Sequence, residues 1–163
     1  MKRFVFKTTF WPLIPLLLLS CSTHRDGRLA ELPELQRGDM VFLDLDCGPL
    51  CDAIEDVTLE QFRVSGPRLS HVGVMISAHE VIEAWPQGGV HIVSLNDFLK
   101  RVSGGHDQPN GFYLGILKAD YRSLAEEAAS RMEGFLGLPY NDSFDWNKDR
   151  FYCSELVSFG YAD

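Results

Sequence analysis

The chain has 163 residues, 45% of them hydrophobic, so it is long enough for one domain with a sizeable core. A formal net charge of −8, with no basic stripe, argues against a nucleic-acid partner. The sequence has no internal repeat and no low-complexity tract, and we therefore predict a single globular domain.

The first twenty residues have the organisation of an export signal. Three basic residues among the first seven precede an apolar run over residues 10–19, which is too short to span a bilayer. The run ends in Leu18-Leu19-Ser20-Cys21, which resembles the bacterial lipobox, where cleavage precedes a lipidated cysteine. We expect a signal peptide over residues 1–20, lipidation at Cys21 and, because Ser22 is not aspartate, a periplasmic address at the outer membrane. An ordinary signal peptide with a chance cysteine is the alternative.

Residues 21–37 are polar and mixed, which predicts a tether, and the domain is predicted to span residues 38–163. Five runs are typical of strands: residues 40–45, 71–76, 81–85, 89–94 and 112–117. Short polar connections join the second, third and fourth runs, which predicts an antiparallel meander. With the helices described next, we expect an α+β domain built on an antiparallel sheet of four to six strands.

Helical patterns cover residues 49–58, 94–102 and 120–135, and a fourth begins at Cys153. In the first helix, Leu50, Ile54 and Val57 are predicted to share one side. The expected capping residues are Ser94 or Asn96 for the second helix and Asp120 for the third.

Cys153 lies where the irregular segment 141–149 gives way to this last helix. A thiol at the start of a helix lies near unpaired backbone N–H groups and the positive end of the helix dipole, and both favour the thiolate. The segment therefore suits a nucleophile. Taken alone, it also suits a buried, inert cysteine that anchors the helix.

His71 and Glu83 are twelve residues apart on consecutive predicted strands. A hairpin centred on Ser77 would set residue 75 opposite 79 and His71 directly opposite Glu83, on the same face. Such a pair forms the base and the orienting residue of a catalytic triad. A two-residue turn at Ala78-His79 would instead put the two side chains on opposite faces.

The order of these motifs carries a resemblance. Ser70-His71-Val72-Gly73-Val74 is followed by the Glu83 strand and then by Gly89-Val90, whereas Pro139-Tyr140 and Tyr152-Cys153-Ser154 come last. The His71 strand, the Glu83 strand and Gly89-Val90 resemble three consecutive strands of NlpC-type papain-like cell-wall peptidases, the first of which carries the catalytic histidine. In those enzymes the cysteine segment precedes the three strands. The order here is similar to that of the circularly permuted branch, the YaeF/YiiX-like papain-like amidases, over about residues 38–159.

The resemblance implies a permuted papain-like fold and a cysteine amidase. It implies Cys153 as nucleophile, with its backbone N–H in the oxyanion hole, His71 as general base and then acid, and Glu83 orienting His71. Three aromatic residues are expected to contact the substrate: Tyr140, Tyr152 and Trp85.

The sequence departs from the family pattern in three ways. Tyr140 lies thirteen residues before the cysteine, where the non-permuted enzymes commonly have twelve. Glu83 occupies a position that is often histidine in those enzymes, and a carboxylate is closer to the permuted branch. The sequence ends ten residues after Cys153, where permuted relatives generally continue, so we expect a minimal form or a cleft that lacks one wall.

Cys47 and Cys51 flank the turn Gly48-Pro49. A local disulfide, two free thiols near the cleft and metal ligation are all open, although zinc would need a second pair of ligands that is not evident nearby. We list the pair as a candidate disulfide and expect no metal and no cofactor. The remaining histidines are interpreted as surface or loop residues: His24, His79, His91 and His106.

The expected function is hydrolysis of an amide, most directly in peptidoglycan peptides, by a monomer anchored to the membrane through Cys21. Two alternatives stay open. One is a hydrolase or acyltransferase acting on lipid or small-molecule amides or esters, and the other is a non-catalytic cell-wall-binding lipoprotein that keeps the cleft. A third reading treats Cys153, His71 and Glu83 as unrelated residues.

Overall fold

The computed structural model describes residues 32–45, 47–62, 68–102, 111–146 and 149–162. The predicted signal peptide and Cys21 lie outside these ranges, as do His24 and His106. Within the described ranges, none of the helices has the length and apolar composition required to span a bilayer.

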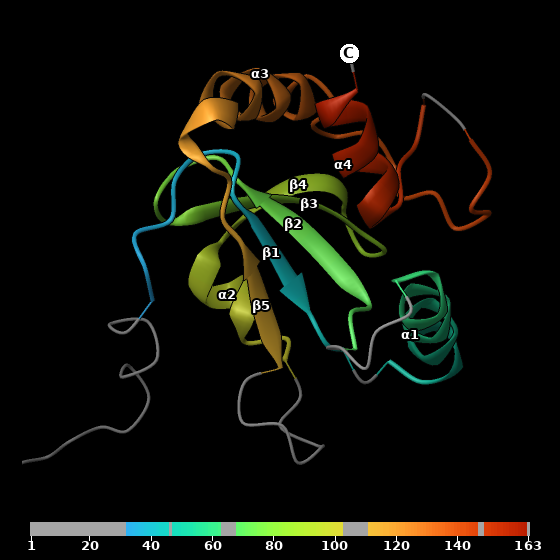
Figure 1. Ribbon diagram of the computed structural model, residues 1–163. Coiled ribbons are helices and arrows are strands. Elements are labelled where there is room, and N and C mark those ends of the chain that lie inside the picture. Colours follow the sequence, from blue (N-terminus) through green and yellow to red (C-terminus); the bar gives the residue numbers. More distant parts are fainter. Residues whose placement is uncertain (1–31, 46, 63–67, 103–110, 147–148, 163) are drawn as a thin grey trace, which may run out of the picture. The chain divides into compact units, whose positions relative to one another are not determined.

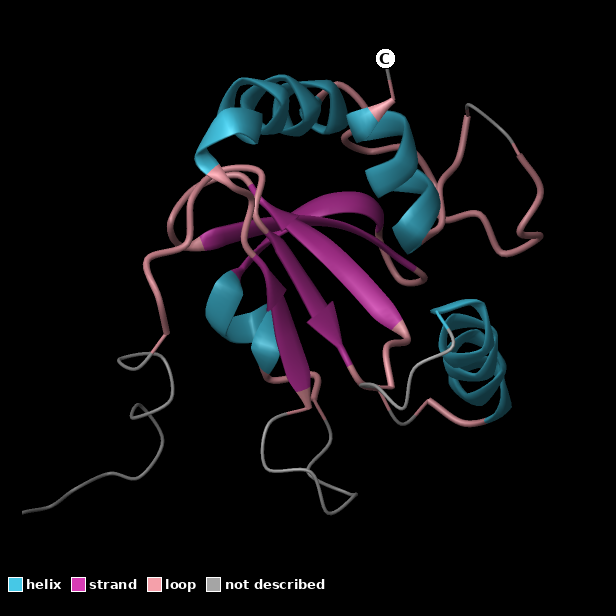
Figure 2. Ribbon diagram, in the orientation of Figure 1, coloured by secondary structure: helices cyan, strands magenta, loops and turns pink. Residues whose placement is uncertain are grey.

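Within the described ranges, five strands form one antiparallel sheet in the order β4-β3-β2-β1-β5 (Figures 1 and 2). Their bounds are Met40–Leu43 for β1, His71–Met75 for β2, Glu80–Trp85 for β3, Gly89–Ser94 for β4 and Phe112–Gly115 for β5. The predicted meander is β2-β3-β4, and β1 and β5 extend the sheet beyond β2. The α+β class and the antiparallel sheet are confirmed.

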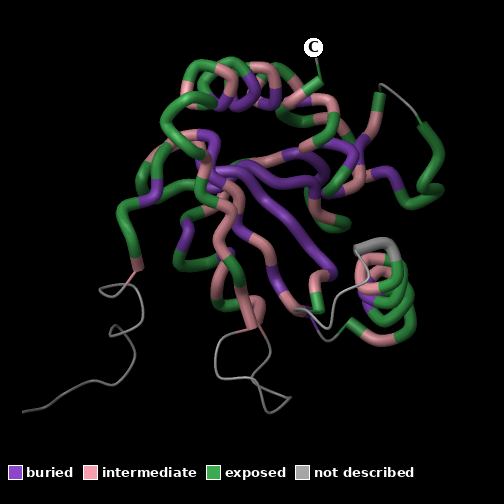
Figure 3. The backbone as a smooth tube through the Cα atoms, in the orientation of Figure 1, coloured by how far each residue is buried: buried purple, intermediate pink, exposed green. Residues whose placement is uncertain are grey.

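Helices α3 (Arg122–Glu133) and α4 (Cys153–Tyr161) lie on one face of the sheet, and α2 (Leu95–Leu99) lies on the other (Figure 1). Because strand residues alternate between faces, the sheet has two apolar layers, and burial is concentrated along the central strands (Figure 3). Leu156 of α4 packs with Val74 and Ile82 on one face, whereas Phe98 of α2 packs with Met75 and Val81 on the other.

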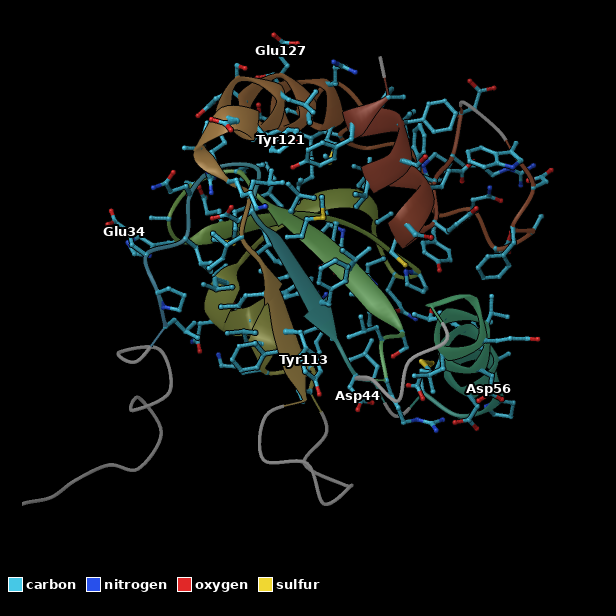
Figure 4. The ribbon with its side chains drawn as sticks, viewed as in Figure 1. Glu34, Asp44, Asp56, Tyr113, Tyr121 and Glu127 are labelled. Atoms are coloured by element: carbon cyan, nitrogen blue, oxygen red, sulfur yellow. A yellow bond between two sulfur atoms is a disulfide. The ribbon has the colours of Figure 1, made fainter. Side chains whose placement is uncertain are left out.

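Helix α1 (Pro49–Phe62) lies beside the beginning of β2 (Figure 1). On the side predicted to carry Leu50, Ile54 and Val57, Leu50 and Val57 are exposed, whereas Cys51 and Glu55 are buried. Buried Glu55 pairs with the partly exposed Arg68. The charged residues Asp56 of α1 and Glu127 of α3 lie on the outer surface of their helices (Figure 4).

The register of β2 against β3 differs from the prediction by two residues. Val74 lies opposite Ile82 and Met75 opposite Val81, whereas we predicted residue 75 opposite 79. Because the shift is even, it leaves His71 and Glu83 on the same face of the sheet. The pairing predicted between them as direct neighbours is therefore wrong, but their shared face is retained.

Two other expectations fail locally. Asp120 does not cap α3, because a 3-10 turn at Ala119–Tyr121 precedes the helix and Tyr121 is its N-cap residue. Residues 32–37, which we assigned to the tether, pack against the domain: Leu35 is buried and Arg37 pairs with Glu133. Ser94 does cap α2, by accepting a hydrogen bond from the Asp97 N–H.

Candidate active site

His71 and Glu83 form a buried hydrogen-bonded pair. The His71 Nε2 lies 2.7 Å from Glu83 Oε2, and Glu83 has no exposed surface. The imidazole is held between Trp85, in edge contact at 5.1 Å between ring centroids, and Phe98 at 5.5 Å. Gly73 makes room for this packing, because a Cβ atom there would lie 2.8 Å from Phe98 Cε2.

Cys153 is the first residue of α4, and its thiol is hydrogen-bonded to His71. Because Nε2 of His71 bonds Glu83, Nδ1 is the ring nitrogen that remains for the sulfur. The described β2–β3 pairing covers Val74 and Met75, so Val72 lies beyond it, and its backbone hydrogen-bonds the sulfur together with that of Ser154. The thiol therefore lies at the start of α4, beside the first residues of β2.

The electrostatics of this pair favour charge separation. Burial lowers the pKa of His71, but hydrogen bonds and charge interactions with Cys153 and Glu83 outweigh it and raise the pKa to about 9. Burial raises the pKa of Cys153, but the hydrogen bond and charge of His71 outweigh it and hold the pKa below its ordinary value. Both shifts favour transfer of the thiol proton to His71, which gives a thiolate and an imidazolium.

Glu83 has two further neighbours, Arg101 and His91, that the sequence analysis missed. Arg101 Nη1 contacts both carboxylate oxygens, and His91 Nε2 lies 3.3 Å from Oε1. The interpretation of His91 as a surface residue is therefore wrong, because β4 places it directly opposite Glu83. The short turn between β3 and β4 could have revealed this register, whereas the contact of Arg101 depends on how α2 folds against the sheet.

The three predicted substrate-contacting residues lie in different surroundings. Tyr140 is joined to Phe151 by a parallel bridge, and burial and then the charge of Cys153 raise its pKa to about 12, so it remains a neutral hydroxyl. Tyr152 precedes the nucleophile and contacts Phe144, with ring centroids 5.3 Å apart. Trp85 packs on His71 and lies under the Arg101 guanidinium.

A second buried polar pair, which the sequence analysis did not single out, fixes the start of α4. Glu155 is buried, and its Oε2 accepts hydrogen bonds from Asn141 Nδ2 at 3.0 Å and from the Tyr152 N–H at 3.3 Å. The spacing of Glu155 from the N-cap residue is that of a capping box, which was the available signal. This arrangement fixes the peptide that carries Cys153.

A pocket of about 230 Å³ opens beside the thiol. Cys153 and His71 form one side of it, and Ile54 and Thr58 of α1 form another. Its remaining lining is mainly apolar: Phe42, Leu69, Ser70, Val72 and Ser154. A carbonyl group that reaches Cys153 would therefore lie beside apolar side chains.

The comparisons with known proteins agree with this geometry. The sequence profile of a family described as permuted papain-like amidase enzymes, YaeF/YiiX, C92 family, matches residues 34–163. The chain belongs to this C92 family. A comparison with curated proteins found no match.

Among solved structures, the C92 chain is similar to one described as the metalloprotein yiiX from Escherichia coli O157:H7, with 25% identity and a TM-score of 0.56. The match covers 79% of this chain and 66% of that one. The permuted papain-like fold implied by the motif order is thus shown, and so is membership of an amidase family.

Cys47 and Cys51, the remaining candidates, are joined by a disulfide across the turn before α1, with Cα atoms 5.3 Å apart. Since α1 supplies one wall of the pocket, the disulfide holds the first turn of that wall. Among the described residues, Cys153 is the free cysteine.

Proposed function

We propose that this C92 family member is a cysteine amidase that acts through a triad of Cys153, His71 and Glu83. The observation that carries the proposal is the continuous hydrogen-bonded chain from the thiol through the imidazole to the buried carboxylate. Membership of an amidase family supports the same reaction class.

In the proposed reaction, the Cys153 thiolate attacks the amide carbonyl carbon and forms a C–S bond. Backbone N–H groups at the start of α4, including that of Cys153, stabilise the oxyanion. The His71 imidazolium gives its proton to the departing amine nitrogen as the C–N bond breaks, and an acyl-enzyme remains. Water then attacks the thioester, His71 accepts a proton from that water, and the thiolate leaves.

Glu83 orients the imidazole and stabilises its charge during both steps. Tyr140, a neutral hydroxyl whose pKa responds to the charge of Cys153, is suited to donate a hydrogen bond to the substrate.

No metal enters this proposal, although the related yiiX structure is described as that of a metalloprotein. Among the described residues, no three histidine, cysteine or carboxylate side chains are gathered to hold a metal ion. Glu83, the carboxylate that contacts His71, also contacts the Arg101 guanidinium, which would repel a metal cation. The described site therefore does not fit a metal.

We propose a peptide amide of peptidoglycan as the substrate, because residues 1–21 have the pattern of an export signal that ends in a lipobox-like segment. The mainly apolar pocket favours a second candidate, an amide or ester with an apolar acyl group, as found in lipids. Both candidates use the same nucleophile and differ in the group that occupies the pocket.

Digestion experiments separate these candidates. Purified peptidoglycan and a series of acyl amides of increasing chain length would each be incubated with the wild type, with Cys153→Ala and with Ser158→Ala. Ser158 lies exposed on the same helix and serves as the control. We expect mass spectrometry to detect cleavage by the wild type and the control, and none by Cys153→Ala. Equal cleavage by Cys153→Ala would refute the mechanism, and no cleavage of either substrate class would favour a binding lipoprotein.

We also propose that the protein is anchored to the outer membrane on its periplasmic side through a lipid on Cys21. Incorporation of labelled palmitate by the wild type and its loss in Cys21→Ala would support the anchor. Equal labelling of both proteins, or recovery of the wild type in the soluble fraction, would refute it.

A further inference from the structure

Three nitrogen-bearing side chains, two histidines and an arginine, reach the buried carboxylate of Glu83 from separate elements. His71 of β2 contacts Oε2, His91 of β4 contacts Oε1, and Arg101, shortly after α2, contacts both oxygens. The carboxylate has no exposed surface, so these groups, and not water, determine its charge state.

Arg101 is fixed by the same two rings that hold the catalytic imidazole. Its guanidinium carbon lies 4.2 Å from the Trp85 ring centroid and 5.7 Å from that of Phe98. The nearby carboxylate of Asp97 bonds Lys100 at 2.7 Å. The charge of Arg101 is therefore directed at Glu83.

His91 cannot replace Arg101 at all pH values. Its Nδ1 lies 2.9 Å from the carbonyl oxygen of Gly89, which only accepts hydrogen bonds, so Nδ1 carries a proton. The Nε2 atom can donate to Glu83 only when the ring is an imidazolium. His71, the third neighbour, exchanges its proton during the proposed reaction. Arg101 alone among these neighbours is charged throughout the pH range of catalysis.

We propose that Arg101 is a positioning residue for the reaction, acting through Glu83. Arg101 keeps the carboxylate ionised and fixed, and the carboxylate in turn keeps His71 oriented toward the sulfur. As a result, Cys153 and His71 remain a thiolate–imidazolium pair down to a lower pH. This inference rests on the proposed function. Without Arg101, the site holds one negative charge in excess, and either the carboxylate takes up a proton or the thiolate becomes harder to form. Both responses move the acid limit of reactivity to higher pH.

The test measures how fast iodoacetamide alkylates Cys153 between about pH 4 and about pH 9, a range that brackets the ordinary carboxyl and thiol pKa values. Mass spectrometry of the tryptic peptide that follows Arg150 reports on Cys153 alone. The wild type would be compared with Arg101→Met, Arg101→Lys and the control Lys100→Met, which removes an exposed neighbouring charge. If Arg101→Met lacks the wild-type circular dichroism spectrum, Arg101→Gln takes its place.

We expect the acid limit to move up by roughly one pH unit in Arg101→Met, which lowers the alkylation rate about tenfold below that limit. Arg101→Lys should recover most of this shift because it restores the charge, and Lys100→Met should match the wild type. Superimposable profiles of Arg101→Met and Lys100→Met, with a reactive wild type, would overturn the role of Arg101 and leave the triad intact. A wild type no faster than a free cysteine at about pH 6 would instead overturn the proposed function.

Discussion

Replacing Glu83 by glutamine keeps the shape of the side chain and removes its charge. The carboxylate contacts His71 at 2.7 Å and His91 at 3.3 Å, and it also contacts the Arg101 guanidinium. In the variant the Arg101 guanidinium and, when protonated, the His71 imidazole face a neutral amide in a desolvated site. Removing one partner of a buried charge pair costs about 3–5 kcal/mol. Because the Arg101 side chain is 21% exposed and His71 can release its proton, we expect a loss of about 3 kcal/mol.

The size of this loss depends on pH. Burial raises the pKa of Glu83, but the hydrogen bonds from His71 and Arg101 outweigh it and hold the pKa below its ordinary value of 4.5. A carboxylate whose pKa is lowered by folding stabilises the protein above its unfolded-state pKa, and this contribution disappears as the pH falls through the folded-state pKa. The wild type and the variant should therefore differ fully at neutral pH and converge in acid.

Thermal unfolding followed by circular dichroism measures this difference. A loss of about 3 kcal/mol corresponds to a Tm lower by roughly 10 °C for a domain of this size. Glu80→Gln, at an exposed position of the same strand, is the matched control and should stay within about 0.5 kcal/mol of the wild type. Equal Tm values for the two variants at neutral pH would refute the claim that Glu83 is buried and ionised. A difference in Tm between the wild type and Glu83→Gln that does not narrow in acid would refute it as well.

Three further outcomes are expected. The amidase kcat/KM should fall as the pH rises through about 9, where His71 loses the proton that the leaving amine needs; an undiminished rate above that pH would contradict this. Ile54→Trp should fill the pocket and lower kcat/KM about tenfold for amides with apolar acyl groups, whereas Val57→Trp, 60% exposed, should not; equal losses would count against this pocket. Gly89→Ala should lower the free energy of unfolding by roughly 2 kcal/mol in a denaturant titration, because Gly89 has φ 65° and a Cβ would lie 2.1 Å from the Leu138 oxygen; no change would show that this contact relaxes freely.

The sequence alone predicted which residues share a face of the sheet and which residue begins the last helix. Side chains alternate between the faces of a sheet, so a shift of two residues in the pairing of β2 with β3 leaves each side chain on its original face. The predicted pairing was wrong by two residues, and His71 and Glu83 therefore still share a face. Likewise, Cys153 at the junction of an irregular segment and a helical pattern predicted a thiol at the start of a helix, as the structure has it.

Contacts that depend on tertiary packing could not be predicted from sequence spacing. Arg101 reaches Glu83 because α2 folds back against the sheet, and no spacing in the sequence encodes that contact. The hydrophobic spacing of α1 did not reveal its buried side, which carries Glu55, paired with Arg68, and Cys51, joined to Cys47. Local patterns fail where a few polar or covalent contacts decide orientation.

The most direct test of the central claim is to trap the acyl-enzyme. The protein would be quenched during turnover of an activated ester, and the mass of the tryptic peptide that follows Arg150 would be determined. We expect the acyl group on Cys153 in the wild type, none in Cys153→Ala, and a much slower appearance in His71→Ala, because the thiolate loses its imidazolium partner. Turnover without an adduct on this peptide, at a rate that Cys153→Ala shares, would contradict the account.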